Sequence, residues 1–247
     1  MKVEENGGAD GGTAGAGRAS GAARKAGAVA APGAAGAAPD RSRLLVATRS
    51  THKLRELREL LGLRAELVDL DDIGIPDEAV EDGETFDSNA SKKARFYAAL
   101  SGLPTLADDS GLEVDHLGGG PGVRTKRYAG ETATDEDNNV KLLGALSGLP
   151  AERRGARYRC VLALVLPEEH GARGGFPVRL AHGTCEGRIA VAPKGSGGFG
   201  YDPIFEPLVE TPGGRTLGEW TAEAKNRISH RGKAARRMHR ALAELGF

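Results

Sequence analysis

The feature that most limits what this chain can fold into is an abrupt change of composition near residue 40. Residues 1–40 contain 24 Gly or Ala residues and no aromatic residue. Such a segment cannot bury enough apolar surface to offset the conformational entropy that it would lose on ordering. We therefore predict a disordered tail over residues 1–40. The remaining residues, 41–247, are predicted to form one folded domain.

Charge and hydropathy argue against several classes of protein. Lys and Arg total 34, as do Asp and Glu, so the formal net charge is zero, whereas a general nucleic-acid binder carries a basic excess. No apolar stretch approaches the ~20 residues that a membrane-spanning helix needs, and no secretory signal is recognisable. The spacing of Cys160 and Cys185 fits neither a metal knuckle nor a redox pair. We therefore expect a cytoplasmic protein with two buried thiols and no nucleic-acid or membrane partner.

The hydrophobic pattern predicts strands that alternate with helices in the first half and strands that cluster in the second. Strands are expected over residues 44–47, 66–70, 105–107, 112–114 (partly exposed), 158–166, 178–185 and 189–192. Helices are expected over 54–61 and 86–101, after Thr134 (with Val140, Leu143 and Leu146 facing inward) and after Ser229. This order favours an α/β fold with a mixed sheet flanked by helices.

Polar residues between the first strand and the first helix suit a phosphate group. Thr48, Ser50 and Lys53 lie at this junction, where a helix N-terminus offers free N–H groups and a partial positive charge. The alternative is that Ser50 or Thr51 merely caps the helix while Lys53 remains in solvent.

Carboxylates and a lysine form a second candidate site. Glu81 lies in a predicted loop, Lys93 on the second helix, and Asp108 and Asp109 at the end of the third strand. Mg²⁺ is commonly held by one or two carboxylates beside a polyphosphate, and a carboxylate there could deprotonate an attacking water. The run Asp-Asp-Ser-Gly is equally compatible with an ordinary turn.

Two later segments suit a flat, acceptor-rich ligand. Pro203 follows the glycine-rich segment 195–200 where a dinucleotide-binding helix would begin, so Phe199 and Tyr201 are candidates for stacking on a base instead. Alternatively, the segment is a surface turn with core aromatics.

The second of these segments is cationic. Lys225, His230 and Arg231, near the start of the last helix, could donate hydrogen bonds to a ligand. The alternative is solvated surface.

Together these segments resemble the inosine triphosphate pyrophosphatase family, whose members cleave deaminated purine nucleoside triphosphates. The matching stretches, in order from residue 44 onward, are ATRSTHKLREL, EDGETFDSNASKKAR, LADDSGLEVDHLGGGPGV, RYAGE, GGFGYDPIF and ISHRG. The resemblance implies an elongated mixed sheet flanked by helices, with two lobes around a central nucleotide-binding cleft. It also implies a homodimer and Mg²⁺-dependent hydrolysis of ITP, dITP or XTP to the monophosphate and pyrophosphate.

The resemblance assigns roles to individual residues. Asp109 matches the general base, and Glu81, Asp109 and Asp108 match metal-binding carboxylates. The matches to substrate contacts are Thr48, Ser50, Lys53, Lys93, Ser110, Phe199, Gly200, Tyr201, Asp202, Lys225, His230 and Arg231. A donor such as Arg231 or His230 would pair with the 6-keto group of hypoxanthine or xanthine. Adenine would leave that donor unpaired, at a cost of roughly 1–3 kcal/mol.

Three positions depart from the family pattern. Ser50 replaces the usual Asn, Ser88 replaces a usual Glu, and Thr125-Lys126 replaces a usual Ser-Ala pair. We expect these changes to tune the rate of the reaction rather than abolish it. Two alternatives stay open, a Maf-like nucleotide pyrophosphatase with another base preference and a nucleotide-binding module without catalysis.

Overall fold

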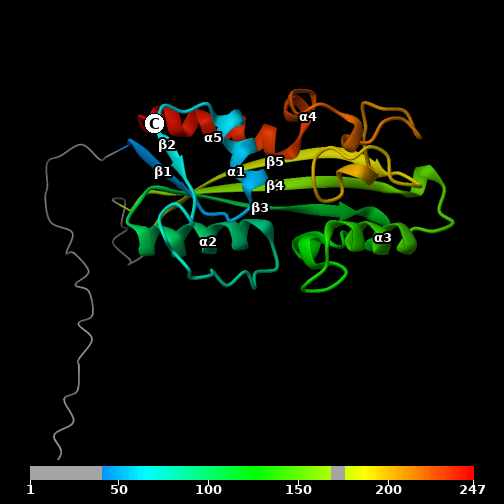
Figure 1. The fold of residues 1–247 in the computed structure, drawn as a ribbon, viewed down its shortest axis with the longest axis horizontal. Helices are drawn as coiled ribbons and strands as arrows, with labels where there is room; N and C mark the ends of the chain where they lie inside the picture. The colour runs from blue at the N-terminus through cyan, green and yellow to red at the C-terminus, as the bar shows by residue number, and fades with distance from the viewer. Residues whose placement is uncertain (1–40, 168–175) are drawn as a thin grey trace, which may run out of the picture. The chain divides into compact units, whose positions relative to one another are not determined.

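The computed structural model describes residues 41–167 and 176–247. The tail predicted over residues 1–40 lies outside them. The described residues form one six-stranded mixed sheet in the order β2-β1-β3-β4-β5-β6, with helices on both sides of its long strands (Figure 1). The predicted α/β class is therefore confirmed, while the two lobes and the central cleft remain predictions.

Three long antiparallel strands form the middle of the sheet. β1 pairs in parallel with β2 and β3, whereas the pairs β3–β4, β4–β5 and β5–β6 are antiparallel. The strands are β1 Arg43–Val46, β2 Glu66–Val68, β3 Thr105–Val114, β4 Gly155–Val165, β5 Val178–Ile189 and β6 Phe205–Pro207. The helices are α1 Thr51–Leu61, α2 Phe86–Ser101, α3 Asp135–Ala145, α4 Ala222–Ile228 and α5 His230–Glu244.

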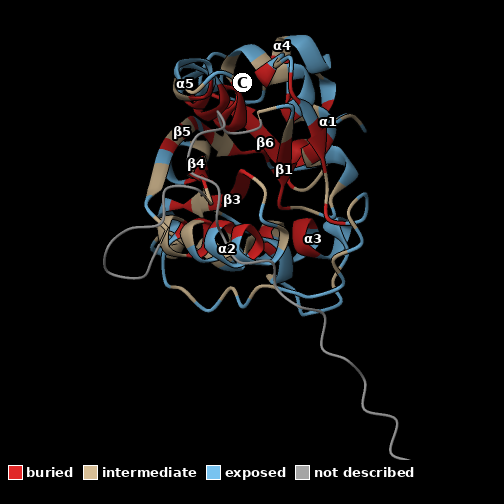
Figure 2. Ribbon diagram, turned by 90° about the vertical axis from the view of Figure 1, so that its left-hand side faces the viewer, coloured by how far each residue is buried: buried red, intermediate tan, exposed pale blue. Residues whose placement is uncertain are grey.

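Side-chain alternation along the strands builds a core on each face of the sheet. Leu106 of β3 belongs to a buried cluster with α1 and α5, whereas its neighbour Ala107 belongs to a cluster with α2. Figure 2 shows the buried residues of these helices turned toward the sheet. Because successive side chains of a strand point to opposite faces, this pattern also sends Asp108 and Asp109 to different faces.

Several boundaries differ from the prediction. Asp108–Gly111 were expected after a strand, but they lie inside the ten-residue strand β3. The ten residue pairs between β3 and β4 continue the ladder through them. The predicted strand 178–185 extends to Ile189 as β5, but residues 190–192 of the second predicted strand, 189–192, are not in a strand. The short helix α4 was not predicted.

Two predictions of exposure were also wrong. Leu112 and Val114 are fully buried, because a third apolar cluster that includes Leu142 covers them. Val140, expected on the inner face of its helix, is 65% exposed. The inner face of α3 instead presents Leu142 together with two buried amides, Asn138 and Asn139. Polar inner residues on this helix concealed its apolar periodicity.

The cysteine and membrane expectations can be compared with the structure directly. Cys160 and Cys185 are both buried and both free, as predicted. Within residues 41–167 and 176–247, no helix is long and apolar enough to span a bilayer.

Candidate functional site

Asp108 lies at the centre of a buried group of charges between β3, α1 and α5. Its carboxylate accepts a hydrogen bond from Arg231 Nε at 2.9 Å and pairs with Lys53 Nζ at 2.6 Å. Ser110 Oγ donates to Oδ1 at 2.9 Å, and Cys160 Sγ donates to Oδ2 at 3.3 Å. Burial alone would raise the pKa of this carboxyl, but Arg231 and Lys53 outweigh burial and hold it well below its usual value.

Glu56 on α1 extends this group toward α4. It accepts from Arg231 Nη1 at 2.6 Å and from Lys225 Nζ at 3.0 Å, and Lys225 also reaches Asp202 at 2.7 Å. Asp202 and Glu56 together raise the pKa of Lys225 against the effect of burial. We call these six side chains the charge cluster: Lys53, Glu56, Asp108, Asp202, Lys225 and Arg231.

The charge cluster exists because the start of α5 lies directly against β5. A Cβ at Gly183 would collide with the backbone of His230, so only glycine permits this approach. Ser229 caps the helix by accepting from Gly232 N at 3.0 Å. His230 and Arg231 are thereby carried into the interior, where Arg231 is 1% exposed. The alternative of a solvated surface at this point is wrong.

Asp109 occupies the opposite, α2-facing side of β3. It is 7% exposed, and its Oδ2 atom is buried without a hydrogen-bond partner. Burial is the main cause that raises its pKa from 3.8 to about 6; Lys93 and Lys53 oppose the rise, while Glu81 and Asp108 add to it. A carboxylate with this pKa can accept a proton near neutral pH.

Lys93 joins the Asp109 side of the strand to the loop that precedes α2. Its Nζ pairs with Glu81 Oε1 at 2.8 Å and donates to the carbonyl oxygen of Asp108 at 3.2 Å. Thr85 starts α2 by accepting from Ser88 N. Ser88 thus takes part in this helix cap through its backbone N–H, which almost any residue could provide. The sequence predicted Glu81, Lys93 and Asp109 as one site, and their charges influence one another in the structure.

The two aromatic residues in and next to the glycine-rich segment, Phe199 and Tyr201, lie in different environments. Tyr201 is buried in the core and donates from its hydroxyl to Thr125 O at 2.8 Å. Phe199 is only half-buried: it stacks on His52 with ring centroids 5.5 Å apart, and Lys225 Nζ lies 4.8 Å from its ring centre. Of the two, Phe199 is the one available for a base.

His230 is placed as a neutral, buried imidazole. Its ring stacks on Tyr158 with centroids 4.6 Å apart and planes 9° from parallel. Burial, together with Arg231 and Lys225, holds its pKa well below the usual value. Its Nδ1 atom is buried and has no partner. A neutral imidazole offers one donor and one acceptor, so this unpaired atom is suited to a ligand.

At the first strand–helix junction, capping and charge pairing occur together. Ser50 caps α1 by accepting from Lys53 N, and Thr48 Oγ1 accepts from Ser50 N at 3.0 Å. Lys53, however, is not left in solvent, because it pairs with Asp108. Ser110 also accepts from Arg231 Nη2 at 2.9 Å, and so it belongs beside the charge cluster.

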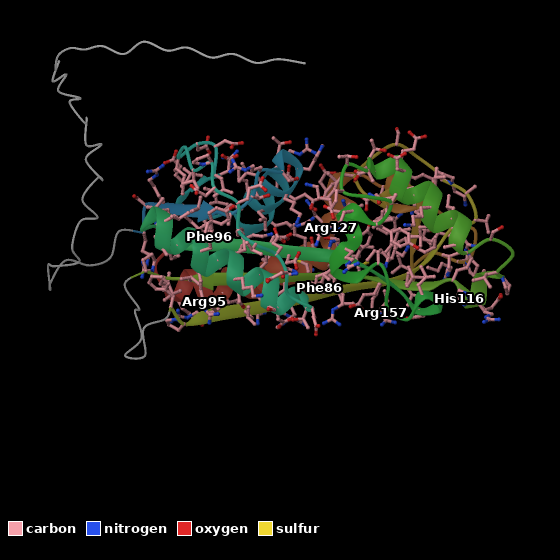
Figure 3. The ribbon with its side chains drawn as sticks, turned by 90° about the horizontal axis from the view of Figure 1, so that it is seen from below. Phe86, Arg95, Phe96, His116, Arg127 and Arg157 are labelled. Carbon is pink, nitrogen blue, oxygen red and sulfur yellow. The ribbon has the colours of Figure 1, made fainter. Side chains whose placement is uncertain are left out.

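Thr125-Lys126 lies in the 3-10 segment η2, Gly122–Arg127. Thr125 Oγ1 accepts from Leu112 N at 2.7 Å, a bond that the usual Ser could also make. Val123 of the same segment packs against the cluster that contains Phe86 at the start of α2. Figure 3 shows Phe86 close to η2, whose last residue is Arg127.

Sequence reasoning missed three residues of this site. Glu56, Tyr158 and Cys160 all touch predicted site residues. Glu56 lies three residues after Lys53 and therefore on the same side of α1, a signal that was available. Nothing in the sequence marks Tyr158 or Cys160, because both depend on the pairing of β4 with β3.

Comparison with known proteins places this geometry in a described family. A sequence model of the Ham1 family matches residues 44–241. A protein of Anaeromyxobacter dehalogenans named dITP/XTP pyrophosphatase is 46% identical over 235 residues, covering 82% of this chain and 97% of that protein. One of Geobacter sulfurreducens with the same name is 49% identical over 194 residues, covering 78% and 92%.

Solved structures agree with the sequence relatives. A HAM1 protein from Coxiella burnetii has a TM-score of 0.71 at 40% identity, covering 82% of this chain and 98% of that one. A nucleoside-triphosphatase / dITP/XTP pyrophosphatase from Mycobacterium abscessus has a TM-score of 0.62 at 43% identity, covering 83% and 98%.

Proposed function

The chain belongs to the Ham1 family, and on that premise we propose that it hydrolyses deaminated purine nucleoside triphosphates (ITP, dITP and XTP) to the monophosphate and pyrophosphate. The observation that carries the proposal is Asp109, a buried carboxylate with an unpartnered oxygen and a pKa of about 6. Lys53 and Lys93 lie close enough to affect that pKa. A general base and two cations beside it are what hydrolysis of a phosphoanhydride needs.

The donor set fits a Mg²⁺ ion held by Glu81 and Asp109. Residues 41–167 and 176–247 contain no cluster of three or more side chains that could hold a metal by themselves. Mg²⁺, however, needs only one or two carboxylates when phosphates and waters complete its shell. The carboxylate of Asp108 is already bonded to Arg231, Lys53, Ser110 and Cys160. We therefore narrow the proposed ligands to Glu81 and Asp109.

The chain's own residues supply the remaining steps. A bound Mg²⁺ would neutralise phosphate charge and acidify a water. Asp109 takes the proton of the attacking water on Oδ2. Lys93 and Lys53 compensate the charge that grows on the leaving pyrophosphate, and Asp108 keeps Lys53 in place.

His230 is the stronger of the two candidates for reading the 6-keto group. Arg231 already uses each of its three guanidinium nitrogens on Asp108, Glu56 or Ser110, whereas His230 Nδ1 has no partner. A base stacked on Phe199 would meet the neutral imidazole, and Arg231 would hold the start of α5 in position.

Release of pyrophosphate from five triphosphates tests the proposal. Inosine, xanthosine, adenosine, guanosine and thymidine triphosphates are compared with and without Mg²⁺. Metal-dependent release confined largely to the first two supports both the reaction and the base assignment. Equal release from all five would retain the phosphate site and refute the base assignment. No release from any substrate would favour a binding module without catalysis, and release from modified pyrimidine or methylated nucleotides alone would favour the Maf-like alternative.

The homodimer, the cytoplasmic location and the domain limits that accompany this function are proposals too. Light scattering of the purified chain tests the dimer. Fractionation of cells tests the location. Removal of residues 1–40 is expected to leave kcat and thermal stability nearly unchanged, because the charge cluster and the Asp109 site lie entirely within residues 41–247.

A further inference from the structure

We propose that Asp135 and Asn139 of α3 are positioning residues that hold the base-stacking segment, and so set the affinity for the base. The inference rests on the proposed function. It concerns residues that make no contact with Asp109, Glu81 or Lys93, and that the resemblance does not assign.

The two side chains form hydrogen bonds with the backbone N–H and the backbone carbonyl of one residue, Gly200. Asp135 Oδ2 accepts from the backbone N–H of Gly200 at 2.6 Å, and Asn139 Nδ2 donates to the carbonyl oxygen of Gly200 at 3.1 Å. Asp135 and Asn139 are four residues apart and therefore share one side of the helix. The bond to Asp135 involves an ionised acceptor, which makes it one of the stronger kinds of hydrogen bond.

The base-stacking segment, residues 195–200, needs contacts from outside to be ordered. It contains Gly195, Gly197, Gly198 and Gly200, and each glycine has more accessible backbone states than any other residue type. At Gly198, φ is +74° and a Cβ would collide with Asp202, so this glycine cannot be replaced by a stiffer residue. Outside contacts must therefore supply the order, and Gly200 is adjacent to Phe199.

The position of Phe199 matters because its ring borders the charge cluster. The ring lies 4.8 Å from Lys225 Nζ and 5.6 Å from Arg231 Cζ. The N–H of Phe199 donates to Asp202, which pairs with Lys225. Movement of the segment would therefore shift the stacking ring relative to the donors that would read the edge of the base.

Helix α3 also forms hydrogen bonds with the chain in and just after η2. Asn138 accepts from Ala129 N at 2.7 Å and donates to Lys126 O at 3.0 Å. Tyr201, the residue after Gly200, donates to Thr125 O. Helix α3 is thus a common support for η2 and for the base-stacking segment, and Asp135 and Asn139 provide the second of these attachments.

The experiment compares four variants with the wild type. Asp135→Ala and Asn139→Ala remove the two grips, and Asp135→Asn restores an acceptor of the same shape without charge. Glu136→Ala is the matched control, because it removes a carboxylate from the same first turn of α3 at an exposed position. Each variant is measured for kcat and KM with ITP, for competitive inhibition by tripolyphosphate, which has no base, and for binding of inosine monophosphate by calorimetry.

We expect Asp135→Ala to raise KM for ITP by about tenfold, the usual effect of losing one charge-assisted hydrogen bond. Inhibition by tripolyphosphate should be unchanged and kcat should change less than twofold. Asn139→Ala should raise KM by a smaller factor, Asp135→Asn should recover part of the loss, and Glu136→Ala should match the wild type. If Asp135→Ala does not fold, Asp135→Asn and Asn139→Ala still carry the comparison.

Two results would overturn the inference. One is that Asp135→Ala and Glu136→Ala behave alike; the other is that tripolyphosphate inhibition weakens in step with ITP binding, which would indicate general loosening of the fold. A wild type without turnover refutes the proposed function alone, because binding of inosine monophosphate still ranks the variants. Absence of that binding from the wild type as well would refute both.

Discussion

Replacing Asp109 with Asn is expected to stabilise the fold while it removes most of the turnover. Asp109 is 7% exposed and its pKa is raised from 3.8 to about 6, chiefly by burial. A carboxyl whose pKa is higher in the folded state than in the unfolded state costs stability wherever it is ionised in both states. The asparagine amide is neutral at every pH and avoids that cost.

The size of the effect follows from the shift in pKa. The rise from 3.8 to about 6 corresponds to about 3 kcal/mol at 1.36 kcal/mol per unit. The cost is absent below the unfolded pKa, grows as pH rises through both pKa values, and is complete above about pH 6. It amounts to roughly 1.6 kcal/mol at pH 5 and about 3 kcal/mol at pH 8. The stability advantage of Asp109→Asn should therefore increase by about 1.4 kcal/mol between these two pH values.

Urea unfolding at pH 5 and pH 8, followed by the fluorescence of the single tryptophan, Trp220, measures this difference. Using the change with pH cancels any constant effect of the substitution on packing. Turnover of ITP by the variant should fall to a small remainder at both pH values, while ITP should still bind to the variant. An advantage that is flat or that decreases between pH 5 and pH 8 would refute the reasoning, as would full turnover in Asp109→Asn.

Two further substitutions test the charges around β3. Lys93→Met removes the foremost cation that lowers the pKa of Asp109, so at fixed Mg²⁺ the rising limb of kcat/KM should move to higher pH; Lys92→Met, whose exposed partner is Asp82, should leave that limb in place. Glu56→Gln leaves Arg231 and Lys225 with less buried counter-charge. It should lower the free energy of unfolding by about 3 kcal/mol, whereas Glu59→Gln, at an exposed position, should be near neutral in the same urea titration.

The parts of the fold that follow local rules could be predicted from the sequence. Ser50, Thr134 and Ser229 cap their helices in the structure, because a side-chain oxygen there satisfies a free backbone N–H whatever the rest of the chain does. The full extent of β5 could not be predicted, since it depends on eleven consecutive pairings with β4. Small residues in the middle of that strand, such as Gly183, are explained only by the backbone of α5 above it.

The candidate site also has a part that the sequence predicts and a part that depends on tertiary packing. Their residue types and their places in predicted loops, helices and strand ends identified Lys53, Glu81, Lys93 and Asp109, because such charged groups suit a polyphosphate. Their partners could not be inferred in this way. Glu56 meets Arg231 across 175 residues of sequence, and Cys160 meets Asp108 across 52. The first contact arises from the packing of α1 and α5 on one face of the sheet, and the second from the pairing of β3 with β4.

Asp108 and Asp109 show why adjacency in sequence is a poor guide to shared chemistry. The pleat of β3 sends the two side chains to opposite faces of the sheet. The residues that pack on each face then determine the pKa and the hydrogen bonds of the carboxyl group on that face. On the side of α1 and α5, Arg231 and Lys53 keep Asp108 ionised and fully engaged. On the side of α2, burial dominates and leaves Asp109 with a pKa of about 6 and a free oxygen. One strand thereby supplies both a permanent counter-ion that orders the cations and a proton acceptor. The role of each aspartate is therefore determined by the helices that cover its face of the sheet, α1 and α5 for Asp108 and α2 for Asp109.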